Sequence, residues 1–177
     1  MANKMNIPFS PPDITQEEID EVAEALRSGW ITTGPRVKEL ERQLAEYLGV
    51  KRCVCLNSQT ACAEMALRVL GVGPGDEVIV PAYTYTASAS VICHVGATPV
   101  MVDCASDSLE MDYEAMARAI TERTKAVIPV DLGGVPCDYD IVFAVLEAKR
   151  DLFHPASDIQ EALGRVAVCE DAAHALG

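Results

Sequence analysis

The feature that most constrains the fold of this chain is a regular alternation between short apolar segments and amphipathic ones. Most of the apolar runs are followed by a longer segment with helical periodicity. The predicted strands are 53–56, 77–80, 99–102, 126–130 and 166–169. Short, continuously apolar strands joined through helices are typical of a parallel sheet that helices cover on both faces. The sequence therefore predicts an α/β fold, a three-layer α/β/α domain with a mainly parallel sheet.

Helix signals support this interpretation. A first helix begins at Thr15, because Thr15 and Glu18 fit the capping box, in which hydroxyl and carboxylate satisfy orphan amides reciprocally. A second helix begins with Pro35, which is tolerated at the first helical position, and it ends at Gly49. The segment 29–34 between them is too polar for a regular element. Further helices are predicted at 60–70, 86–95, 112–120 and 141–150.

The bulk composition excludes several classes of protein. The formal net charge of the 177 residues is −13 and no basic run occurs, so nucleic acid and anionic membranes are not expected partners. The first residues lack a secretory signal and no apolar run is long enough to cross a bilayer, so a cytoplasmic location is expected. The seven cysteines form no C-x-x-C pair and the three histidines show no zinc-site spacing. We therefore expect reduced thiols and no metal.

Ligands of open α/β sheets bind beyond the carboxyl ends of the strands, and three polar segments are predicted to lie there. The first is 57–61, at the start of a helix. Free backbone N–H groups with Ser and Thr hydroxyls suit a phosphate at such a position. The alternative is that Ser58 or Thr60 simply caps the helix.

The other two segments follow the strands that end near residues 80 and 169. Tyr83 and Tyr85 offer rings that could stack on a flat heteroaromatic group, and the alternative for both is core packing. Asp171 comes directly after a buried strand, where a carboxylate needs a cationic partner. A protonated pyridine nitrogen would be such a partner, and the alternative is a helix-capping Asp.

A phosphate site, a stacking aromatic and a pyridinium carboxylate occur here in the order in which fold-type I pyridoxal 5'-phosphate (PLP) enzymes use them. Four motifs narrow the resemblance. They are Gly-Trp-Ile-Thr-Thr-Gly-Pro at 29–35, Gly-Pro-Gly-Asp-Glu-Val-Ile-Val-Pro at 73–81, Gly-Ala-Thr-Pro-Val at 96–100 and Glu-Asp-Ala-Ala-His at 170–174. From about Ile7 to its last residue, the chain resembles the DegT/StrS family of sugar aminotransferases.

The resemblance implies the large-domain fold of aspartate aminotransferase-like enzymes, PLP as cofactor and pyridoxamine phosphate (PMP) in the half-reaction. It implies small-molecule substrates, namely an amino donor such as glutamate and a keto group on a nucleotide-linked sugar. It also implies a homodimer with its active site at the interface. The implied cofactor residues are Gln59, Thr60 and Ala61 at the phosphate, Tyr85 over the ring, Asp171 at the ring nitrogen and His174 near the ring hydroxyl. The implied substrate residues are Trp30, Thr32 and Thr33.

Three departures from the family pattern point to a divergent subgroup whose substrate is not assigned. Gln59 stands where a Gly is usual, so that its Cβ lies at the phosphate cup. Asp131 begins a segment that usually starts with His, on the substrate side of the site. The stretch 139–165 is longer than usual, and 151–155 within it is expected to be an added surface feature.

The family's Schiff-base lysine is expected a few tens of residues beyond Asp171. Lys125 and Lys149 lie in the wrong places to substitute for it. Residues 1–34 are therefore interpreted as an N-terminal helix with an active-site loop. Residues 35–177 are interpreted as an incomplete PLP-binding large domain, in a truncated chain without the C-terminal small domain. Because Schiff-base chemistry needs the lysine amine, this chain is expected to be inactive by itself.

Two other functions remain open at the level of sequence. Some relatives carry His at the lysine position and use PMP to dehydrate a sugar, and nothing in these residues excludes that reaction. A truncated, non-catalytic homologue that dimerises or binds a small ligand is the alternative from a different class. A dinucleotide-binding domain is disfavoured, because no G-x-G-x-x-G follows the first predicted strand.

Overall fold

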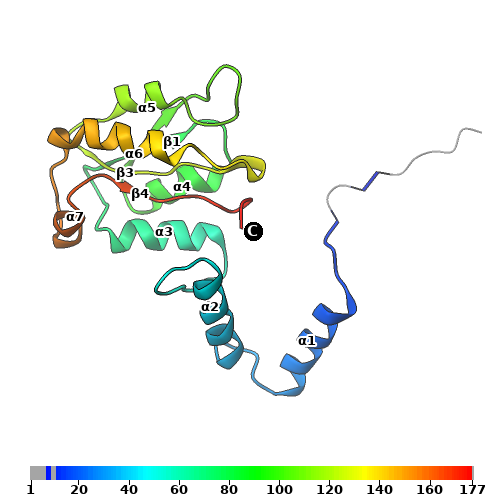
Figure 1. The fold of residues 1–177 in the computed structure, drawn as a ribbon. Coiled ribbons are helices and arrows are strands. Elements are labelled where there is room, and N and C mark those ends of the chain that lie inside the picture. Colours follow the sequence, from blue (N-terminus) through cyan, green and yellow to red (C-terminus); the bar gives the residue numbers. More distant parts are fainter. Residues whose placement is uncertain (1–6, 9–10, 177) are drawn as a thin grey trace, which may run out of the picture. The chain divides into compact units, whose positions relative to one another are not determined.

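The computed structural model describes residues 7–8 and 11–176, and its contacts divide the chain into two compact units, 1–55 and 56–177 (Figure 1). Each unit is described by itself. The observed boundary lies after Cys55. The predicted division at residue 34 concerns roles in an active site, and it stays a prediction.

The first unit contains two helices, α1 (Gln16–Arg27) and α2 (Pro35–Tyr47), both as predicted. The capping box at Thr15 is present, since the Thr15 backbone N–H donates to the Glu18 carboxylate at 2.6 Å. The predicted strand at 53–56 is wrong. The backbone N–H of Cys55 donates to the Glu41 carboxylate at 3.0 Å instead of entering a strand ladder.

The second unit contains a four-stranded parallel sheet with the order β2-β1-β3-β4. The strands are β1 (Glu77–Pro81), β2 (Thr98–Val102), β3 (Thr124–Val127) and β4 (Ala167–Val168). The helices are α3 (Gln59–Val69), α4 (Thr86–His94), α5 (Tyr113–Ala119), α6 (Tyr139–Ala148) and α7 (Asp158–Leu163). Two 3-10 turns, η1 (Leu132–Gly134) and η2 (Arg150–Leu152), follow β3 and α6.

Alternate residues of β1 enter two separate apolar clusters. Val78 and Val80 pack with α3 and α4, whereas Ile79 packs with residues of α5 and α6. Because successive strand residues point to opposite faces, the sheet is covered by helices on both sides. The predicted three-layer α/β/α fold with a parallel sheet is confirmed.

Helix α7 lies in the long stretch 139–165 and was not predicted, because six residues are too few to show a helical period. Its residue Gln160 is buried, and the side-chain amide donates to the Leu70 carbonyl at the end of α3 at 3.0 Å. The part of this stretch that forms α7 therefore docks on the domain. Among the residues that the structure describes, no helix combines the length and apolarity that spanning a membrane requires.

Candidate active site

Four segments of the second unit meet at the carboxyl edge of its sheet. The segments after β1, β3 and β4 lie there because parallel strands end at the same edge. Helix α3 leads into the amino end of β1 and therefore begins at this edge as well. The chain's last described residues and the start of α3 lie toward one end of the sheet in Figure 1. The topology thus places all the predicted cofactor residues at the same edge of the sheet: Gln59, Thr60, Ala61, Tyr85, Asp171 and His174.

Asp171 is the most enclosed of these residues, with 5% of its surface exposed. Its Oδ2 accepts a hydrogen bond from the Ser88 hydroxyl at 2.9 Å, and its Oδ1 accepts one from the Ala173 backbone N–H at 3.3 Å. Both donors are neutral, and within the described part of the chain no Lys, Arg or His side chain pairs with this carboxylate. A buried carboxylate of this kind fits a cationic ligand such as a protonated pyridine.

The sequence analysis did not identify two side chains linked to this carboxylate. Ser88 binds it directly, and Thr84 is linked to it through Ser88. Ser88 lies in the first turn of α4, and its hydroxyl lies 3.1 Å from the Thr84 hydroxyl. The signal in the sequence that could have identified them is the spacing of two hydroxyl residues, four positions apart, at a helix start. The carboxylate to which Ser88 donates is 83 positions away in the sequence, so spacing alone does not reveal it.

The turn after β3 holds His174. The strand pairing of β3 and β4 continues as a bridge between Val130 and Asp171. Beyond it, the Gly133 backbone N–H donates to Nδ1 of His174 at 3.2 Å. Nδ1 is therefore the acceptor, and the neutral ring carries its hydrogen on Nε2. Gly134 has a φ of +81°, and a Cβ there would lie 3.1 Å from the His174 carbonyl oxygen, so this turn requires glycine.

Asp131, at the unusual position noted in the sequence, is buried and braces the same turn. Its Oδ1 accepts hydrogen bonds from the Cys137 backbone N–H and from the Tyr139 hydroxyl, both at 2.9 Å. Burial, followed by the bond to Asp131, raises the pKa of Tyr139 well above its usual range. Burial and the neighbouring Asp131 also raise the pKa of Glu170. The Asp131 carboxylate thus has a structural partner in Tyr139, which sequence reasoning did not connect to it.

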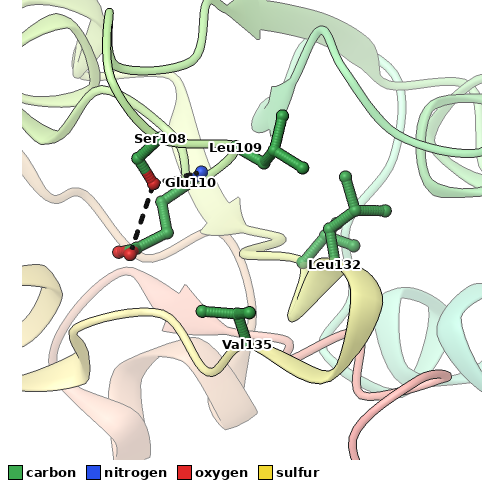
Figure 2. A pocket seen from close by; sticks show the side chains of 6 residues that line it. Ser108, Leu109, Glu110, Leu132 and Val135 are labelled. Carbon is green, nitrogen blue, oxygen red and sulfur yellow. Dashed lines mark hydrogen bonds between the residues drawn. The ribbon is translucent and has the colours of Figure 1, made fainter.

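A small hollow of about 120 Å³ lies beside this turn. Figure 2 shows Leu109, Leu132 and Val135 around it, with a hydrogen bond from Ser108 to the Glu110 carboxylate at its side. Its lining is completed by Val130. The lining is mostly apolar, and the unusual segment that begins at Asp131 supplies part of it.

At the start of α3, the Ser58 hydroxyl accepts a hydrogen bond from the Ala61 backbone N–H at 3.1 Å. The helix-capping interpretation of Ser58 is therefore confirmed. Capping uses the N–H group of Ala61. The N–H groups of Gln59 and Thr60 in the same turn have no acceptor within the helix. This leaves donors that point out of the helix start, as an anion site requires.

Tyr85 precedes α4 and is 79% exposed, and Tyr83 is exposed as well. Neither ring packs in the core of the second unit as the structure describes it. The exposed ring of Tyr85 lies at the carboxyl edge, where it remains accessible to a ligand.

The predicted substrate residues Trp30, Thr32 and Thr33 lie in the first unit, between α1 and α2. The Trp30 indole N–H donates to the Thr33 carbonyl at 3.1 Å, which closes the loop on itself. Trp30 and Thr32 help to line a hollow of about 300 Å³, together with Ser28, Gly34, Pro35 and Arg36. The loop is thus shaped locally, and its role toward a substrate stays a prediction.

Gly34→Ala is expected to displace the Trp30 ring. An added Cβ would lie 2.1 Å from the indole Nε1, so the ring and its bond to Thr33 must move. Since Trp30 is the chain's single tryptophan, we expect its fluorescence to shift to longer wavelength and to be quenched more readily by acrylamide. Gly73→Ala is the control, because its Cβ meets no atom closer than 3.8 Å. Identical spectra for Gly34→Ala and the unchanged protein would contradict this packing.

The fold and the site define a three-layer α/β/α domain with a buried carboxylate at the carboxyl edge of its sheet, suited to a cationic cofactor. The chain matches the DegT/DnrJ/EryC1/StrS aminotransferase family over residues 12–177 and belongs to it.

Similar proteins agree with this assignment. The chain is 43% identical to the spore coat polysaccharide biosynthesis protein SpsC of Bacillus subtilis, over 99% of the chain and 42% of SpsC. It is 63% identical to the putative sugar aminotransferase Spr1654 of Streptococcus pneumoniae, solved in PMP and PLP forms. That match has a TM-score of 0.95 and covers 98% of this chain and 44% of Spr1654. The predicted family is confirmed, as is PLP as the family's cofactor.

A structure of GDP-4-keto-6-deoxymannose-3-dehydratase is also similar, at 25% identity and a TM-score of 0.81. The match covers 97% of this chain and 42% of the dehydratase. The chain therefore spans less than half the length of each of these three proteins.

Proposed function

We propose that this chain is part of a PLP-dependent aminotransferase that transfers an amino group from an amino acid, such as glutamate, to a keto group on a nucleotide-linked sugar. The observation that carries the proposal is the buried Asp171 carboxylate, whose hydrogen-bond partners Ser88 and Ala173 are neutral donors. Family membership supports the reaction, and the names of SpsC and Spr1654 support a sugar substrate. The enzyme is proposed to act in the cytoplasm as a homodimer.

Each predicted residue has a role in this proposal. Asp171 pairs with the ring nitrogen of PLP, which supplies an electron sink for bonds at the amino carbon. The N–H groups of Gln59 and Thr60 at the start of α3 face the phosphate, and Ala61 beside them completes this segment. Tyr85 covers the ring, and the Nε2 hydrogen of His174 is available to the ring hydroxyl. Trp30, Thr32 and Thr33 are proposed to contact the substrate.

We also propose that these 177 residues do not catalyse transamination by themselves. Lys125 lies at the amino end of β3, and its ammonium donates to the carbonyls of Glu122 and His154 at 2.8 and 2.6 Å. Lys149 follows the end of α6, which also points to the amino edge. Neither amine lies at the edge that holds Asp171, where a Schiff base with the cofactor would form.

The test compares the 177-residue polypeptide with the product of the complete coding sequence. Both are supplied with PLP and glutamate; each turnover passes one amino group from glutamate to PLP, so 2-oxoglutarate and PMP are measured as products in equal amounts. We expect turnover only from the complete product. Turnover by the 177 residues would refute their proposed inactivity, and none from either would favour a non-catalytic protein. Sedimentation of the complete product as a monomer at all concentrations would refute the homodimer.

The similarity to the dehydratase favours one second candidate, a PMP-dependent sugar dehydratase. The two reactions differ in whether the amino nitrogen of glutamate enters the sugar. An aminotransferase incorporates the amino nitrogen of glutamate into the sugar, whereas a dehydratase releases water from the sugar. Incubation with a keto sugar and nitrogen-15 glutamate therefore separates them, because only transamination labels the sugar product.

A further inference from the structure

Asp171 stands at the end of a short chain of hydroxyl groups. The Ser88 hydroxyl lies 2.9 Å from Oδ2 of Asp171, and the Thr84 hydroxyl lies 3.1 Å from that of Ser88. Ser88 is 1% exposed and Asp171 is 5% exposed, so water has little access to the bond between them. Hydrogen bonds in such surroundings are electrostatically stronger than in water.

The number of hydroxyl hydrogens fixes the direction in which these hydrogen bonds are donated. An ionised carboxylate only accepts hydrogen bonds, so the single hydroxyl hydrogen of Ser88 is donated to Asp171. Ser88 then has only lone pairs left for Thr84, and Thr84 must be the donor in that contact. The order Thr84 to Ser88 to Asp171 therefore holds while Asp171 is charged, and each bond polarises the next.

We propose that Ser88 is a positioning residue that keeps the proton shared between Asp171 and a pyridine ring nitrogen on the nitrogen. This inference rests on the proposed function. A donor to a carboxylate favours its ionised form. With Ser88 in place, the proton therefore resides on the ring, which is the state that withdraws electrons. Without Ser88, the buried Asp171 carboxylate competes for that proton. Thr84 reinforces the effect by fixing the Ser88 hydroxyl.

The chain offers matched variants. Ser88→Ala removes the donor, and Ser88→Thr keeps a hydroxyl at the same position. Thr84→Val replaces a hydroxyl by a methyl group and leaves the Ser88 donor intact. Ser90→Ala is the control, because Ser90 lies on the same helix and its hydroxyl donates only to the Ala87 carbonyl, at 3.2 Å.

The experiment uses the complete protein loaded with PMP that carries nitrogen-15 in its ring. The nitrogen chemical shift reports how much of the ring is protonated, independently of activity, and PMP affinity is measured in parallel. We expect Ser88→Ala to change the equilibrium constant for proton transfer from the ring nitrogen to Asp171 by about tenfold in favour of Asp171. Loss of one hydrogen bond to a charged group produces a change of this size. Thr84→Val should shift the signal less in the same direction, and Ser88→Thr should restore it.

The outcomes separate the two proposals. If the unmodified protein does not bind PMP, the proposed function fails and this inference fails with it. If it binds PMP with a protonated ring, and Ser88→Ala gives the same shift as Ser90→Ala, the function stands and the role of Ser88 is refuted. Should Ser88→Ala not fold, an unchanged shift in Thr84→Val refutes the directed chain.

Discussion

Asp171→Asn is expected to lower the rate of transamination by the complete protein about 10²- to 10³-fold. The amide has the size of the carboxylate, and its oxygen can still accept the Ser88 hydrogen bond, so the fold should persist. The charge that is proposed to face the ring nitrogen of PLP is lost. Leaving one partner of a buried ion pair unpaired costs about 3–5 kcal/mol, and each 1.4 kcal/mol in the barrier is a factor of ten.

Asp138→Asn is the matched control for this substitution. Asp138 caps α6 by accepting the Ile141 backbone N–H at 3.0 Å, and it is exposed. Asn caps helices about as well as Asp, so neither stability nor rate should change measurably. The rates are compared at saturating glutamate, with circular dichroism as the check on folding. An Asp171→Asn protein that keeps more than about a tenth of the rate would contradict the role of this carboxylate.

The fold was predictable from local patterns because most of its elements carry their own signals. The continuous apolar run of β1 marks a strand that is buried on both faces, and Thr15 and Asp112 mark helix starts because each caps a nearby backbone N–H. Positions such as Asp171 were identified because a carboxylate that follows a buried strand is chemically unusual.

Apart from the short helix α7, the misses share one physical cause, which is that they depend on partners distant in the sequence. Residues 53–56 have the composition of a strand, but a strand also needs a neighbour, and Cys55 bonds to Glu41. Ser88 shows no sign of function until the fold brings it to Asp171. A local pattern cannot specify such pairs, and the same holds for Gly133 with His174.

Leu67→Ala is expected to be the most destabilising of the substitutions considered, and it bears on the site as well. Leu67 is 0% exposed and packs in the cluster with Val78, Val80 and Val91 that attaches α3 to the sheet. Truncating a buried Leu to Ala costs about 2–5 kcal/mol, because it loses apolar contacts and leaves a cavity. A lower urea midpoint with an unchanged denaturant slope would report this loss of stability.

Two variants on the same helix test whether this effect comes from burial. Val69→Ala removes apolar atoms at a position that is 58% exposed, and its free energy of unfolding should change by no more than about 0.5 kcal/mol. Leu67→Met keeps the volume and should cost less than about 1.5 kcal/mol. Equal midpoints for Leu67→Ala and Val69→Ala would refute the anchoring role of Leu67. Because α3 carries the proposed phosphate site at its start, a loosened α3 should also weaken PLP binding, whereas Val69→Ala should leave it unchanged.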